Sequence, residues 1–114
     1  MSLASQHCQP CRGDSLPASP AEQVAYLAEL PGWSRVEVAG IDHLVRAYAF
    51  HSYGDGLAFA QRLGNLADQE DHHPTLIIEW RKVTVQWWTH AIRGLHHNDF
   101  VMAAKSDALY QVFA

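Results

Sequence analysis

The sequence predicts an α+β domain in which three helices pack on one face of a four-stranded antiparallel sheet. Three segments carry helical signals, and four short segments are rich in β-branched and aromatic residues. The strands of each pair lie too close in the chain for a crossover, so each pair should be a hairpin. The expected order is α-β-β-α-β-β-α. At 114 residues the chain is long enough for one core and too short for two lobes.

Residues 1–18 are expected to form a flexible segment ahead of a single domain that spans residues 19–114. The segment is rich in Pro, Ser and Gly, and it contains Cys8 and Cys11 at the spacing of a redox or zinc half-site. A zinc site needs about four ligands, and only His7 lies near the two cysteines. A reduced, mobile tail is therefore favoured over metal or redox chemistry, which is the alternative.

The first helix is predicted to begin in the stretch SPAEQVAYLAEL. Ser19 is a good cap, Pro20 suits the first helical position, and Glu22 completes a capping box. Residues at helical spacing mark one apolar face, namely Val24, Leu27, Ala28 and Leu30.

Two hairpins and two further helices are predicted after this. Residues 33–38 and 43–50 should pair through the turn AGID, and residues 75–80 and 82–90 through a tight connection near Arg81. Between the hairpins, residues 55–70 form the second helix, with an apolar side of Phe59, Leu63, Leu66 and Ala67. Residues 94–113 form the third helix.

The four tryptophans are expected mainly in the core, Trp87 most clearly because it shares a strand face with Val83 and Val85. Trp33 and Trp88 are the two that we also consider as rings on which a flat heteroaromatic substrate stacks.

Composition excludes two classes of partner. The net charge is −4 and the eight Lys and Arg residues form no cluster, so nucleic-acid binding is not expected. The longest apolar run lies near residues 76–78, far short of the ~20 residues of a membrane span. The N-terminus lacks the pattern of a signal peptide, so we expect a cytoplasmic protein that does not contact membranes.

Titratable groups gather in the stretch EDHHPTLIIEW, residues 70–80, where the chain changes from helix to strand. If the helix continues, Asp68 and His72 share a face and the carboxylate orients the imidazole. His73 then points another way, and His90 at the end of the fourth strand supplies a third imidazole. Histidine has an unperturbed pKa near 6.5, so such a group is suited to proton transfer near neutral pH.

The alternative is that these histidines are exposed loop or strand-end residues. A zinc site is disfavoured because adjacent histidines rarely chelate one ion well and no HExxH motif is present. A second pair, His96 and His97, precedes the third helix and is interpreted as surface or capping residues.

The sequence also resembles the pterin-4a-carbinolamine dehydratases. The shared features are DHHP at residues 71–74, Trp80, TH at residues 89–90, GL followed by Asp99, and LPGW before the first strand. The resemblance extends from about Pro20 to the C-terminus, and the CxxCR lead-in is similar to that of some bacterial members.

The resemblance implies an enzyme that dehydrates 4a-hydroxytetrahydropterin to quinonoid dihydropterin and needs no metal or cofactor of its own. It implies a homodimer or homotetramer, and a functional link to phenylalanine hydroxylase through recycling of the pterin for aromatic amino acid hydroxylation. The catalytic histidines fall on His72, His73 and His90. Substrate contacts fall on Asp68, Asp71, Pro74 and Thr89.

Three positions depart from the family pattern. Asp68 stands where Glu is common, Trp88 stands where a small residue is frequent, and His96 replaces the usual Ser or Thr cap, which would cost ~1 kcal/mol of capping. Trp88 in particular favours the second functional hypothesis, a divergent pterin-binding, interaction or assembly protein on the same fold. The complete histidine set favours the enzyme.

Overall fold

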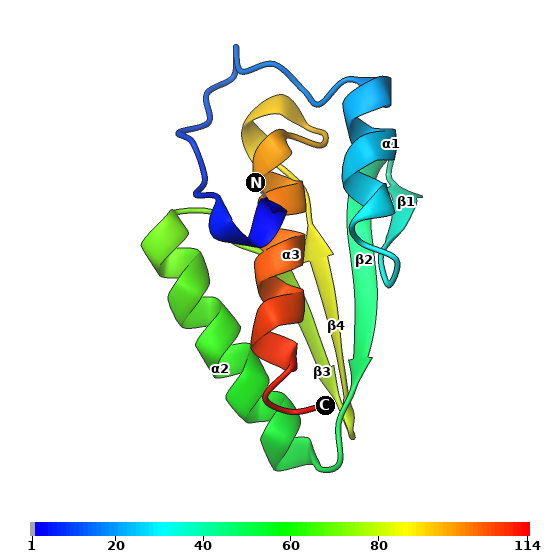
Figure 1. Cartoon of the computed structure of the whole chain (residues 1–114), viewed down its shortest axis with the longest axis vertical. Helices are drawn as coiled ribbons and strands as arrows, with labels where there is room; N and C mark the ends of the chain where they lie inside the picture. The colour runs from blue at the N-terminus through cyan, green and yellow to red at the C-terminus, as the bar shows by residue number, and fades with distance from the viewer. Residues whose placement is uncertain (1) are drawn as a thin grey trace.

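The computed structural model describes residues 2–114. Met1, the first residue of the predicted flexible segment, lies outside the described residues. The predicted α+β class and its α-β-β-α-β-β-α order are confirmed (Figure 1). In chain order the elements are η1 (Leu3–Ser5), α1 (Pro20–Ala28), β1 (Ser34–Val38), β2 (Ile41–Ala49), α2 (Tyr53–Glu70), β3 (Thr75–Glu79), β4 (Lys82–Trp87), η2 (His90–Ile92) and α3 (His97–Tyr110).

The sheet has the strand order β1-β2-β4-β3, and every neighbouring pair is antiparallel. Both predicted hairpins form, and β2 and β4 pair in the centre. The first hairpin turns at Ala39 and Gly40, whose φ angles of 53° and 80° suit a tight two-residue connection. In Figure 1, α2 and α3 lie in front of the sheet and cover one of its faces.

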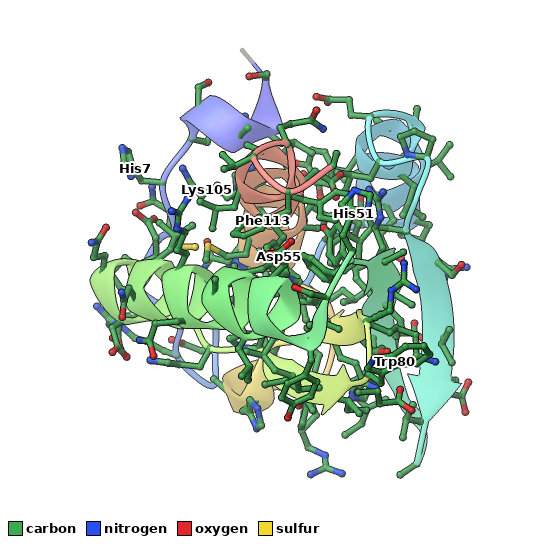
Figure 2. All side chains as sticks on the ribbon, turned by 90° about the horizontal axis from the view of Figure 1, so that it is seen from below. His7, His51, Asp55, Trp80, Lys105 and Phe113 are labelled. Atoms are coloured by element: carbon green, nitrogen blue, oxygen red, sulfur yellow. The ribbon has the colours of Figure 1, made fainter. Side chains whose placement is uncertain are left out.

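The core lies between the helices and the sheet, where side chains fill the space seen in Figure 2. Val83, Val85 and Trp87 of β4 are fully buried, as their alternation predicts. They pack with apolar side chains from the neighbouring strand β2 and from the helices α2 and α3, including Leu44, Tyr48, Phe59, Leu63, Phe100 and Met102. None of the helices in residues 2–114 combines the length and apolar character needed to cross a bilayer.

The expectation of a buried position is wrong for Trp80 and for two residues of the apolar face predicted for the first helix, Val24 and Ala28, which are exposed. Trp80 is 76 % exposed because it lies in the turn between β3 and β4, where the Arg81 guanidinium sits 5.4 Å from its ring centroid. Val24 is 72 % exposed because α1 contacts the body of the protein through another side, where Tyr26 packs on Phe100. The capping box of Ser19 and Glu22 forms as predicted.

Gly64 lies inside α2, and a Cβ atom built there would meet no atom within 4 Å. We therefore expect Gly64→Ala to raise the free energy of unfolding by about 1 kcal/mol, because alanine restricts the unfolded chain more and has the higher helix propensity. Urea denaturation measures the change. Gly56→Ala is the matched control. Its Cβ would lie 3.3 Å from Val83, so this variant should gain less stability. A loss of stability in Gly64→Ala would contradict this expectation.

Candidate active site

The two adjacent histidines lie just beyond the end of α2. Asp71 closes the helix in the left-handed conformation, with φ 52° and ψ 42°, so helical spacing does not extend to His72. The predicted pairing of Asp68 with His72 is therefore wrong. His73 instead donates from Nε2 to Asp68 Oδ1 at 2.9 Å, and both side chains are more than half exposed.

His72 is held by a buried carboxylate from another helix. Its Nε2 donates to Asp99 Oδ1 at 2.7 Å, and its ring stacks on Trp87 with centroids 5.8 Å apart. Asp99 is fully buried, and its Oδ2 accepts from the Thr89 hydroxyl at 2.7 Å and the His96 backbone N–H at 2.9 Å. Because a carboxylate only accepts, Nε2 carries a proton, and Nδ1 is the ring nitrogen that makes no hydrogen bond within residues 2–114.

His96 caps α3 in spite of its residue type. Its Nδ1 accepts from the Asn98 backbone N–H at 3.0 Å, and Asp99 completes the capping box. Burial lowers the pKa of His96, which favours the neutral ring that this hydrogen bond needs. The capping hydrogen bond that a Ser or Thr would supply is therefore replaced, which removes the reason for the expected loss of ~1 kcal/mol. Asp99 both starts α3 and fixes His72.

His90 lies beyond β4, which ends at Trp87 and not at residue 90 as predicted. It begins the 3-10 helix η2, and the isolated bridge from Thr89 to Gly94 fixes the chain at this point. The rings of Trp88 and His90 have centroids only 3.9 Å apart, and Trp88 also lies 4.9 Å from His43. Trp88 therefore restricts where the His90 imidazole can lie.

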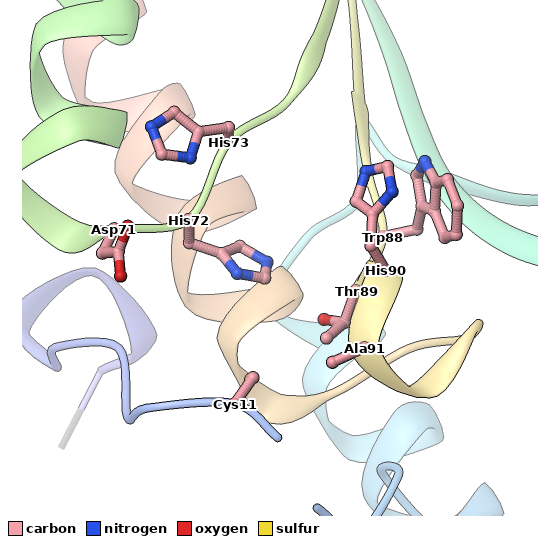
Figure 3. A pocket seen from close by; sticks show the side chains of 8 residues that line it. All are labelled: Cys11, Asp71, His72, His73, Trp88, Thr89, His90 and Ala91. Atoms are coloured by element: carbon pink, nitrogen blue, oxygen red, sulfur yellow. The ribbon is translucent and has the colours of Figure 1, made fainter. Parts of the chain in front are cut away.

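A cavity of about 190 Å³ opens between the segment that follows α2, with His72 and His73, and the segment that follows β4, with His90. In Figure 3, His72 and His73 lie on one side, and Trp88 and His90 on the other. Its lining consists of Cys11, Asp71, His72, His73, Trp88, Thr89, His90 and Ala91. The structure thus brings the three predicted catalytic histidines together with three of the predicted binding residues.

The other predicted binding residues lie outside the cavity lining. Asp68 does not line the cavity and contacts it only through His73, its hydrogen-bond partner. Pro74 follows His73 and does not line the cavity. Trp33 is in the core, where its Nε1 donates to Asp107 at 3.0 Å, so it has a packing role and does not stack on a ligand in this cavity.

Asp99 is a functional candidate that the sequence analysis did not include, and Cys11 was considered there for metal or redox chemistry only and not for this cavity. Cys11 comes from a segment predicted to be a tail, and Asp99 was noted only as part of the motif shared with the family. The GL and Asp99 motif of the family resemblance was the one signal that pointed to Asp99.

The N-terminal segment docks on α2 and α3. Leu3 is 2 % exposed, and the Cys8 backbone N–H donates to Glu70 Oε1 at 2.8 Å. The flexibility of residues 1–18 stays a prediction.

Alkylation of Cys8 distinguishes a docked from a mobile segment. Burial, followed by the charge of Glu70, raises the pKa of the Cys8 thiol to about 12. Its thiolate fraction at pH 8 is then roughly a thousandfold smaller than that of an ordinary thiol. We expect iodoacetamide to modify Cys8 at least ~100-fold more slowly in the native protein than in urea, as followed by mass spectrometry. Equal rates would support the flexible segment.

Comparison with known proteins gives the same family as the sequence motifs. Residues 16–109 match the family described as "Pterin 4 alpha carbinolamine dehydratase". A protein of Microcystis aeruginosa named "Putative pterin-4-alpha-carbinolamine dehydratase" is 45 % identical over 109 residues, covering 96 % of this chain and 94 % of its own. One of the same name from Chlorobaculum tepidum is 46 % identical over 107 residues, covering 94 % and 96 %.

A solved structure is also similar. The chain from Brucella melitensis described as "transcriptional coactivator/pterin dehydratase" superposes with a TM-score of 0.75 at 26 % identity, covering 82 % of this chain and 98 % of that one. Fold, motifs and near full-length similarity agree, and this chain belongs to the pterin 4 alpha carbinolamine dehydratase family.

Proposed function

We propose that this chain catalyses the loss of water from a 4a-hydroxytetrahydropterin to give the quinonoid dihydropterin. The observation that carries the proposal is the convergence of His72, His73 and His90 on one cavity. The family membership names the substrate class, and the cavity supplies groups suited to its chemistry.

The reaction needs one acid and one base. The C4a–O bond breaks as an acid protonates the hydroxyl, which leaves as water, and the C4a=N5 bond forms as a base takes the N5 proton. We assign these proton transfers to His73 and His90, which lie on opposite sides of the cavity in Figure 3. Positioned acid-base groups contribute typically 10²- to 10⁴-fold each.

His72 has a different role because its Nε2 is committed to Asp99. Its Nδ1 is available to bind or assist the substrate. We propose that Trp88, Thr89 and Asp71 contact the pterin, with the indole of Trp88 as the stacking surface. Asp68 supports the site through His73.

We further propose that the domain of residues 19–114 works in the cytoplasm as a homodimer or homotetramer. In this role it recycles the pterin of aromatic amino acid hydroxylation, alongside phenylalanine hydroxylase. The support for these statements is the family resemblance.

The test is the dehydration rate of freshly generated 4a-hydroxytetrahydropterin, followed by ultraviolet absorbance with and without the purified protein. We expect strong acceleration over the spontaneous reaction. No acceleration would favour the second candidate, a divergent binding or interaction protein. Trp88 is the observation that favours this candidate, because its ring narrows the cavity beside His90.

A further inference from the structure

Three histidines line the cavity of about 190 Å³ (the histidine cavity), and His90 differs from the other two in what orients its ring. A carboxylate holds the imidazole of His72 and another holds that of His73. Within residues 2–114 the His90 ring makes no hydrogen bond. Its close neighbour is the indole of Trp88, with centroids 3.9 Å apart and planes tilted by 34° (Figure 3). The orientation of His90 therefore depends on how firmly Trp88 is held.

Trp88 lies just beyond the end of the strand pairing. β4 ends at Trp87, whose partner Leu44 is the last residue of the register between β2 and β4. Successive residues of a strand point to opposite faces of the sheet, so Trp88 projects away from the face on which Trp87 is buried. Because the pairing ends here, side-chain contacts have the larger part in holding the indole.

The side chain that contacts Trp88 from within the sheet is His43. It belongs to β2, pairs with Val36 of β1, and has its ring centroid 4.9 Å from that of Trp88. His43 is only 5 % exposed, and its Nδ1 donates to the Ile41 carbonyl at 2.8 Å. Burial and this hydrogen bond fix the imidazole on a paired strand, so it offers Trp88 a rigid surface.

We propose that His43 is a positioning residue for His90 and that it acts through Trp88. The three rings form a column from the paired sheet to the cavity, in which His43 limits the rotation of Trp88 and Trp88 limits that of His90. His43 does not line the cavity, so it acts without touching the substrate. The inference rests on the proposed function for the reaction that His90 serves, whereas the ring column is a property of the protein without substrate.

Two substitutions separate the ring of His43 from its hydrogen bond. His43→Phe keeps a ring beside Trp88 and loses the donor to Ile41. His43→Asn loses the ring and keeps a nitrogen donor as far along the side chain as Nδ1. We expect His43→Asn to lower kcat for 4a-hydroxytetrahydropterin by about 3- to 10-fold, with KM changed less than about twofold, because a loosened His90 spends less time in the productive orientation. His43→Phe should keep kcat within about twofold.

Proton nuclear magnetic resonance of the substrate-free protein gives a second readout. The ring current of the Trp88 indole displaces the signals of the His90 ring protons, which the His90→Ala variant identifies. We expect these signals to move toward their ordinary positions in His43→Asn and to stay in place in His43→Phe. Val36→Thr is the matched control, because Val36 is the cross-strand neighbour of His43 and does not line the cavity. It should change neither kcat nor the His90 signals.

The two readouts separate this inference from the proposed function. If the protein accelerates no dehydration but the His90 signals depend on a ring at position 43, the dehydratase proposal fails and the ring column stands. Unchanged His90 signals in His43→Asn, an unchanged kcat of that variant in an active protein, or an equal loss in His43→Phe would each overturn the positioning role.

Discussion

Replacing His73 by alanine is expected to lower the rate of 4a-hydroxytetrahydropterin dehydration by about two to four orders of magnitude. The free energy of unfolding should change by no more than about 0.5 kcal/mol. His73 is 56 % exposed, and its partner Asp68 is 79 % exposed, so the substitution removes little packing and only a weak ion pair. Ultraviolet absorbance gives the rate, and urea denaturation gives the stability.

His51→Ala is the control for this variant. His51 is another exposed histidine, it precedes α2, and it does not line the histidine cavity. Its replacement should leave the rate unchanged. If His73→Ala were as active as the intact protein, the assignment of a proton transfer to His73 would be wrong. His90 and His72 would then have to supply the acid and the base.

Asp99→Asn is expected to lower the rate by about 10- to 100-fold, because it changes which nitrogen of His72 carries a proton. The His96 backbone N–H can only donate, so the amide oxygen should stay on that side. The amide NH₂ then faces His72 Nε2, which must accept, and the ring proton moves to Nδ1. Nitrogen-15 NMR of the His72 ring distinguishes the two tautomers directly.

The same change at Asp68 gives the comparison. Asp68→Asn alters an exposed partner of His73, and exposed pairs contribute only about 0–1 kcal/mol, so the rate should fall less than about tenfold.

Asp99→Asn should also lose about 1–3 kcal/mol of stability, since a buried acceptor site is removed. An Asp99→Asn protein with the original His72 tautomer and full activity would contradict the positioning role.

The sequence predicted the fold because its signals are local. The capping box at Ser19, the turn at Gly40 and the alternation that buries Val85 each depend on neighbouring residues, and all three appear in the structure. Strand pairing within hairpins follows from the same short connections.

The partner of His72 could not be predicted in this way. The assumed i, i+4 pair with Asp68 needed the helix to continue, whereas Asp71 in the left-handed conformation ends it. Asp99 lies 27 residues further along the chain, and only the packing of α3 against the sheet brings it to His72. Cys11 was missed for a related reason, since docking of the N-terminal segment depends on Asn98, far away in sequence.

The central strand pair has a consequence for how the protein becomes active as it folds. β2 and β4 pair from Leu44 with Trp87 to Ala49 with Lys82, and the whole of α2 and β3 lies between them in the chain. Closing that long loop costs more entropy than forming either hairpin, so it belongs to the slow step of folding. His73 and His90 follow α2 and β4 respectively, and the helix α3 that anchors His72 comes later still. A nascent or partly refolded chain therefore holds its hairpins before it holds the histidine cavity.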